Sequence, residues 1–102
     1  HDNRAKALKR LRRSLWISHR QPPPPDAANA FSGGWPTTKS PGFLPAAALV
    51  LDMLDAMEGR VADAARELET GSAALAEFLR QDEDVWREAA QIRQRHGLPV
   101  LR

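Results

Sequence analysis

Cationic side chains gather at the N-terminal end of the sequence, and their type and spacing suit one chemical task. Seven cations and no acidic residue lie between Asn3 and Arg20, namely Arg4, Lys6, Lys9, Arg10, Arg12, Arg13 and Arg20. Lys and Arg bind phosphate groups, and neutralising phosphates releases counterions from a nucleic acid. An ordinary solvated helix face would intersperse Glu among these cations. The run therefore predicts a phosphate-binding arm, with a solubilising helix face as the simpler alternative.

The charge of the chain is divided between its two ends. Residues 1–44 carry eight Lys and Arg against two Asp, a net charge of +6. Residues 45–102 carry seven Arg against eleven Asp and Glu, a net charge of −4. A basic arm joined to an acidic body indicates that one end contacts a polyanion while the other folds or binds protein. Charge does not distinguish RNA from DNA, although Trp16 and His19 are candidates for stacking on an unpaired base.

No set of side chains in this sequence is suited to catalysis or metal binding. The chain has no Cys, and His1, His19 and His96 are too dispersed to suggest a metal site. The acidic run 82–84 lies where a helix is expected to begin, which favours a capping role. No Ser has a recognisable base partner, and no glycine-rich phosphate loop of the usual pattern is present. We therefore expect no enzyme activity, cofactor or metal.

The apolar residues also argue against a membrane protein. No apolar run approaches the roughly 20 residues that a membrane-spanning helix needs. The basic N-terminus is not followed by an apolar stretch of the signal-peptide type. These features predict no membrane partner, and the lack of Cys fits a reducing compartment.

The elements that position the cations are predicted to be helices, in an all-α fold with three parts. Residues 1–19 form a basic helix, because Leu8, Leu11 and Leu15 recur at helical spacing. Residues 20–44 form a Pro- and Gly-rich linker, for which docking through its aromatic residues and disorder are both open. Residues 45–102 form a compact acidic bundle of three to four helices, at about 45–57, 61–69, 73–80 and 83–96.

Local signals set the expected helix ends. Ser72 and Asp82 are predicted N-caps, and Pro45 occupies a favoured first-turn position. Gly59 and Gly97 are expected to end the helices before them. Phe31, Trp35 and Phe43 are the aromatic residues expected to dock the linker if it is ordered.

Residues 64–79 have the pattern of a helix-turn-helix pair. Ala65 would lie where the two helices cross, and the shared core would be Leu68, Leu75, Phe78 and Leu79. Glu69 stands where such turns often have Gly. Residues 61–88 carry three Arg against eight acids, a net charge of −5, which would repel a phosphate backbone. We therefore expect a structural or protein-contacting unit, with a DNA-binding protein, such as a small regulator or phage-type packaging subunit, as an alternative.

A protein-interaction adaptor is a further alternative. In this hypothesis the bundle uses Phe78, Trp86 and Ile92 on a partner helix or in self-association.

The first fifteen residues resemble the segment that closes the catalytic domain of class I peptide chain release factors and their ribosome-rescue relatives. In that family a Ser-Gln-His-x-Asn-(Lys/Arg) run leads into a helix, and the matching residues here are Asn3, Arg4, Ala7, Leu8 and Leu11. The resemblance implies ribosome association in the cytoplasm, in translation termination or ribosome rescue. The family's catalytic Gly-Gly-Gln loop precedes this helix and is not found in this chain, and Gly33-Gly34-Trp35 follows the helix and lacks the Gln. The resemblance therefore implies the C-terminal portion of a larger factor, or a degenerate relative, acting as a non-catalytic RNA- or ribosome-associated module.

Overall fold

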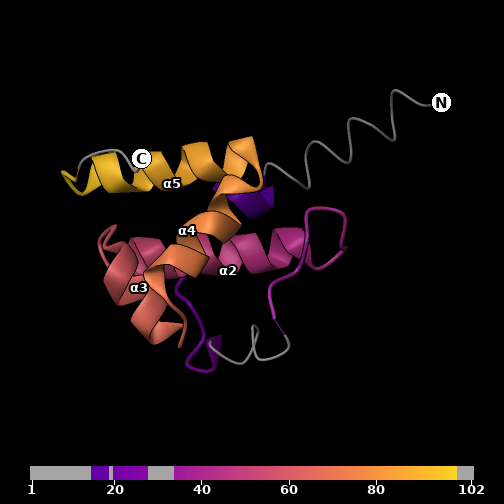
Figure 1. Cartoon of the computed structure of the whole chain (residues 1–102). Helices are drawn as coiled ribbons and strands as arrows, with labels where there is room; N and C mark the ends of the chain where they lie inside the picture. Colours follow the sequence, from indigo (N-terminus) through magenta and orange to yellow (C-terminus); the bar gives the residue numbers. More distant parts are fainter. Residues whose placement is uncertain (1–14, 19, 28–33, 99–102) are drawn as a thin grey trace.

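The computed structural model describes residues 15–18, 20–27 and 34–98, and this part of the chain is all-α (Figure 1). Residues 15–18 form one helical turn. The later elements are α2 (Phe43–Ala56), α3 (Val61–Glu67), α4 (Ser72–Arg80) and α5 (Glu83–Arg95). Each lies within two residues of its predicted bounds, so the predicted fold class is confirmed. Most of the helix predicted near the N-terminus lies outside the described residues.

Helix α2 is the centre of the bundle. It packs against α5 on one side and α3 on the other, and α4 bridges α3 and α5. Figure 1 shows α5 running above α2, with α4 crossing between α3 and α5. The core is filled by fully buried apolar side chains: Phe43, Val50, Leu51, Leu54, Leu68, Leu75, Phe78, Leu79, Val85 and Ile92. Burial of this apolar surface is the main term that stabilises the assembly.

The helix-turn-helix pattern is present as packing. Ala65 is 2% exposed, and the four side chains predicted to form the shared core, Leu68, Leu75, Phe78 and Leu79, are all buried. Because Ala has no side chain beyond Cβ, helices α3 and α4 can approach closely at this position. The predicted core of this pair is confirmed.

The turn between α3 and α4 has the backbone that a Gly usually adopts. Glu69 has φ +56°, in the left-handed region. The N–H of Thr70 donates to the carbonyl of Ala65 at 2.9 Å, and the N–H of Glu69 donates to that of Arg66 at 3.1 Å, which is a Schellman ending. The turn therefore has the usual geometry of a helix C-terminus, although Glu69, unlike Gly, adopts the left-handed conformation at some strain.

The predicted helix caps are confirmed in part. The Asp82 carboxylate accepts hydrogen bonds from the N–H groups of Asp84 (2.9 Å) and Val85 (3.1 Å), as expected of an N-cap. Ser72 is not an N-cap: Gly71 occupies that position and Ser72 begins α4. Gly97 follows α5 with φ +76°, as expected of a glycine that ends a helix. At the end of α2 the backbone has positive φ at two successive residues, Glu58 (+59°) and the predicted Gly59 (+81°).

Part of the Pro-rich linker is docked on the bundle. The rings of Trp35 and Phe78 lie 4.7 Å apart between centroids, and Phe43 lies 5.2 Å from the same Phe78 ring. Ala27 is 3% exposed. The expected docking holds for Trp35 and Phe43, while Phe31 lies outside the described residues. Phe43 already belongs to α2, so that helix begins two residues before the predicted boundary at 45.

Candidate nucleic-acid interface

The predicted phosphate contacts divide into two groups. Six of the seven, Arg4, Lys6, Lys9, Arg10, Arg12 and Arg13, lie outside the described residues, as does His19. Trp16, the other stacking candidate, is 41% exposed on the helical turn 15–18, and Leu15 beside it is 58% exposed. Ile17, by contrast, is 6% exposed and belongs to the hydrophobic core. The turn that follows the cationic run therefore has one side on the bundle and one side on solvent.

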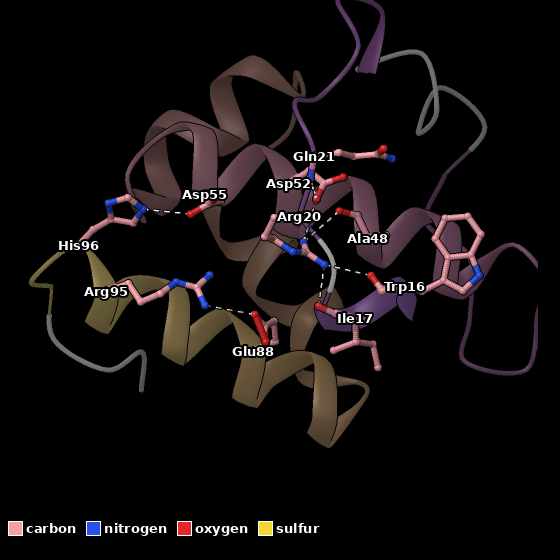
Figure 2. Close-up of polar contacts among 10 residues, drawn as sticks. All are labelled: Trp16, Ile17, Arg20, Gln21, Ala48, Asp52, Asp55, Glu88, Arg95 and His96. Carbon is pink, nitrogen blue, oxygen red and sulfur yellow. Dashed lines mark hydrogen bonds and ion pairs between the residues drawn. The ribbon is translucent and has the colours of Figure 1, made fainter. Parts of the chain in front are cut away.

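Arg20 is the predicted phosphate contact that the structure describes, and it points into the protein (Figure 2). Its Nη2 donates to the carbonyl oxygens of Ile17 at 2.6 Å and Trp16 at 3.0 Å. Its Nη1 lies 3.0 Å from the Asp52 carboxylate and 3.4 Å from the carbonyl oxygen of Ala48, both on α2. Only 13% of the Arg20 side chain is exposed. The Arg20 guanidinium is thus engaged inside the fold, and its phosphate contact stays a prediction.

Asp52 is the acidic partner that makes this arrangement possible. Its side chain is 4% exposed, within an otherwise apolar stretch of α2. A buried carboxylate needs charge pairing and hydrogen bonds to offset its lost hydration. Arg20 supplies the charge, and the backbone N–H of Gln21 donates to Asp52 Oδ1 at 3.3 Å. Two successive residues of the N-terminal segment therefore converge on one carboxylate.

Burial shapes the electrostatics of this pair. Desolvation lowers the pKa of Arg20 below its ordinary value, and the Asp52 carboxylate opposes that shift. A guanidinium remains protonated at physiological pH even so. Among the described residues, the Arg20 Nε atom is a buried donor without a hydrogen-bond partner. The Arg20–Asp52 pair therefore carries a desolvation penalty, which reduces its net contribution to the free energy of unfolding.

Further charged groups surround the pair along α2 and α5. Figure 2 shows Glu88 beside Arg95 on α5, with 3.7 Å between Oε1 and Nη1. It also shows Asp55 of α2 beside His96, with 3.0 Å between Oδ1 and Nε2. Glu88 is 8% exposed. Desolvation raises the pKa of the Glu88 carboxyl, while Arg95 and Arg20 oppose that shift. The edge of the α2–α5 contact is consequently a mixed-charge cluster.

Helix α4, which would read bases in a DNA-binding protein of this motif, presents little that suits the task. Its exposed side chains are Ser72, Ala73, Ala74, Glu77 and Arg80. The Arg80 guanidinium carbon lies 5.1 Å from the centroid of the Trp86 ring, in a cation–π contact. Direct readout needs donors for base edges together with cations for phosphates. This face offers one arginine, one hydroxyl and an acid, so its chemistry disfavours DNA reading.

The residues predicted for an adaptor surface are mostly internal. Phe78 is 1% exposed and Ile92 is fully buried. Trp86 is partly buried and packs against the core. Phe78 and Ile92 cannot contact a partner without opening the bundle, so the prediction is wrong for these two residues, whereas for Trp86 it stays a prediction. The periodicity places Phe78 and Ile92 correctly on apolar faces, but those faces pack against other helices of the same chain.

Searches of the described residues for two other kinds of site gave no candidate. No group of three or more His, Cys, Asp or Glu is placed to hold a metal ion within residues 15–18, 20–27 and 34–98. No helix in this part of the chain is long and apolar enough to cross a membrane.

Comparison of the chain with protein-family profiles, with curated proteins and with solved structures gave no match.

The buried acids are the residues that sequence reasoning missed, although both had a signal. Asp52 interrupts the apolar stretch 49–54 and lies one turn after Ala48, which is also buried. Glu88 lies three residues after Val85 and four before Ile92, on the inward face of α5. An acid at a core position requires a partner. That rule predicts a cationic partner for each buried acid, but it does not identify which of the fifteen Lys and Arg supplies the charge.

Proposed function

We propose that this chain is a non-catalytic, cytoplasmic RNA-binding module that associates with ribosomal or transfer RNA through its basic N-terminal arm. The arm is residues 3–13, with the six cations named above as its phosphate contacts. The bundle, residues 34–98, anchors the arm and presents an acidic surface that keeps the phosphate backbone away from α3 and α4. The observation that carries the proposal is the division of charge, +6 before residue 45 and −4 after it.

Electrostatics favour the arm as the binding element. Phosphate neutralisation supplies most of the affinity in sequence-independent recognition. Six cations within eleven residues concentrate that attraction at one end of the chain. The bundle surface contributes the opposite field, because Glu67, Glu69 and Glu77 are exposed on α3, the following turn and α4. The polyanion is therefore expected to approach the chain from its N-terminal side.

The resemblance to release factors favours RNA over DNA as the target. The helix-turn-helix packing of α3 and α4 supports the DNA-binding alternative, but the exposed face of α4 opposes it. A direct comparison between a labelled RNA hairpin and duplex DNA of the same sequence distinguishes the two. We expect tighter binding to the hairpin, at matched salt.

Charge reversal in the arm tests the proposal. Arg10→Glu with Arg13→Glu is expected to weaken binding of the RNA hairpin by about 100-fold at low salt, because two phosphate contacts are lost and repulsion is added. The slope of log affinity against log salt should fall by about 1.4–1.8, or 0.7–0.9 per lost contact. Fluorescence anisotropy over a salt series measures both quantities.

A matched control makes the same charge change on the bundle. Arg66 and Arg87 are exposed on α3 and α5, and each pairs with neighbouring acids on its own helix. Exposed pairs of this kind contribute little to stability. Arg66→Glu with Arg87→Glu should change RNA affinity far less than the arm variant. Equal losses from the two double variants would mean that only net charge matters, and the proposed interface would be rejected.

A further inference from the structure

The contacts of Arg20 join two segments that are far apart in the sequence. The residue follows the cationic arm, and the Asp52 and Ala48 atoms that it contacts belong to the middle of α2, 28 or more residues away. On its other side it contacts Trp16 and Ile17, four and three residues before it, respectively. One guanidinium thus bridges the base of the arm and the bundle. A planar group with five fixed donors is suited to such a multi-way contact.

The carbonyl groups that Arg20 binds are those of a helix end. Trp16 and Ile17 lie in the helical turn 15–18, where the last carbonyls lack partners within the helix. A cation at this end also interacts favourably with the helix dipole. Arg20 therefore caps the turn that directly follows the arm, and at the same time it ties this turn to Asp52.

The energetics of the pair favour a positioning role over a stabilising one. A buried ion pair contributes little net stability compared with apolar packing, since desolvation of both charges offsets their attraction. It does, however, restrict the geometry, because breaking it leaves a charge buried without a partner. Ile17 packs in the hydrophobic core. The contacts of Arg20 and Ile17 together therefore fix the position of the helical turn 15–18 on the bundle.

We propose that Arg20 is a positioning residue for RNA binding: paired with Asp52, it holds the base of the basic arm against α2, so that the arm meets RNA in one orientation. This inference rests on the proposed function of the arm. It removes Arg20 from the set of phosphate contacts and assigns part of the RNA affinity to Asp52, a buried acid that cannot reach the ligand.

The sign of one substitution separates positioning from contact. Removing an acid ordinarily strengthens binding to a polyanion, because a repulsive charge is lost. Asp52→Asn is expected to do the opposite and to weaken binding to the labelled RNA hairpin. If the base of the arm is then held in place only about a tenth of the time, the affinity falls by about tenfold. The exposed acid Glu77 provides the control, since Glu77→Gln should leave affinity unchanged or raise it slightly.

The salt dependence of the Arg20 variant gives an independent readout. Arg20→Gln should lower affinity by a similar factor without changing the slope of log affinity against log salt, because no phosphate contact is removed. A lost contact would reduce that slope by about 0.7–0.9. Arg93→Gln is the matched control: it removes the same charge from α5, where Nη1 donates to the carbonyl of Gly59 at 2.6 Å. It should leave affinity nearly unchanged.

Folding is measured for each variant by thermal unfolding before binding is compared. If Asp52→Asn is unfolded at the assay temperature, Arg20→Lys takes its place, because lysine keeps the charge and thus a phosphate contact but lacks the planar fork. Loss of affinity in Arg20→Lys then supports positioning, and full retention overturns it.

The two proposals fail in different ways. If Asp52→Asn leaves affinity unchanged or raises it, or if Arg20→Gln lowers the salt slope, the positioning role is overturned while the arm remains the binding element. If the Arg10→Glu, Arg13→Glu variant still binds RNA as tightly as the parent, the proposed function itself is lost.

Discussion

The two halves of the bundle differ in what lies between their helices. Helices α3 and α4 meet through Ala65, Leu68, Leu75, Phe78 and Leu79, which are all apolar and all buried. The two buried acids of the described residues, Asp52 and Glu88, lie instead on α2 and α5. An apolar contact gains free energy in proportion to its area and tolerates many arrangements. A buried charge gains little, but it requires one partner in one place.

Both halves contribute apolar burial, since Leu51 of α2 and Ile92 of α5 are also fully buried. The α2–α5 half differs by holding the two buried acids in addition. The α2–α5 half receives the N-terminal segment through Arg20 and Gln21. We therefore expect core variants of α3 and α4 mainly to lower the free energy of unfolding. Variants of Arg20 and Asp52 are expected mainly to change how the arm is positioned.

The largest expected effect breaks the apolar half. Leu75 is fully buried, and Leu75→Ala should lower the free energy of unfolding by about 2–5 kcal/mol through lost burial and the cavity left behind. Leu15 is 58% exposed, so Leu15→Ala is the matched control, with an expected change within about 0.5 kcal/mol. Urea titration followed by circular dichroism measures both. Similar values for the two would contradict the packing described for α4.

The second-largest effect is expected at Gly59, where the connection between α2 and α3 approaches α5 closely. Gly59 has φ +81°, and a Cβ there would lie 3.1 Å from the Arg93 Cα and 3.2 Å from Leu98 Cδ1. Gly59→Ala should therefore destabilise the protein by about 2–3 kcal/mol, from backbone strain and overpacking together.

Gly97 separates those two causes. It has φ +76° but no atom within 4 Å of a Cβ built on it. Gly97→Ala should cost only the backbone strain, about 1 kcal/mol. Thermal unfolding compares the two variants, and a larger loss for Gly97→Ala would contradict the close approach at Gly59.

A smaller effect on stability is expected in the turn between α3 and α4. Glu69 holds the left-handed position of the α3–α4 turn at φ +56°. Glu69→Gly should raise the free energy of unfolding by about 0.5 kcal/mol, because the strain relieved slightly exceeds the extra freedom of Gly in the unfolded chain. Glu67, the last residue of α3, gives the opposite expectation: Glu67→Gly should cost up to about 1 kcal/mol. Destabilisation by both would place residue 69 in an ordinary helical conformation.

The smallest expected effect concerns the buried acid Glu88 and is a dependence of the free energy of unfolding on pH. Burial raises the pKa of Glu88 above 4.5, so folding favours its protonated form. Its contribution to stability is present below that ordinary value and is lost as the pH rises through the folded-state pKa. Glu88→Gln stays neutral at every pH. The stability of this variant relative to the parent should therefore increase from acidic to neutral pH.

Chemical unfolding at a series of pH values measures that trend. Glu67→Gln, which removes an exposed acid from α3, is the matched control for the loss of one negative charge. A relative stability of Glu88→Gln that falls toward neutral pH would mean that the Arg95 pairing outweighs desolvation at this site.

The sequence by itself determined the helices and the apolar half of the bundle. Helical spacing, the Asp82 cap and the small Ala65 are local or near-neighbour signals, and each specifies its element with little help from the rest of the chain. The sequence also determined the division of charge, from which the RNA-binding proposal follows.

Only the tertiary structure decided the contacts of Arg20, one of fifteen Lys and Arg in the chain. Composition treats these cations alike, because charge is counted without regard to where a side chain points. The fold brings Asp52, 32 residues later, within 3.0 Å of Arg20 and leaves both side chains largely buried. A long-range contact of this kind depends on the packing of helices that are each specified elsewhere in the sequence, so no local pattern records it.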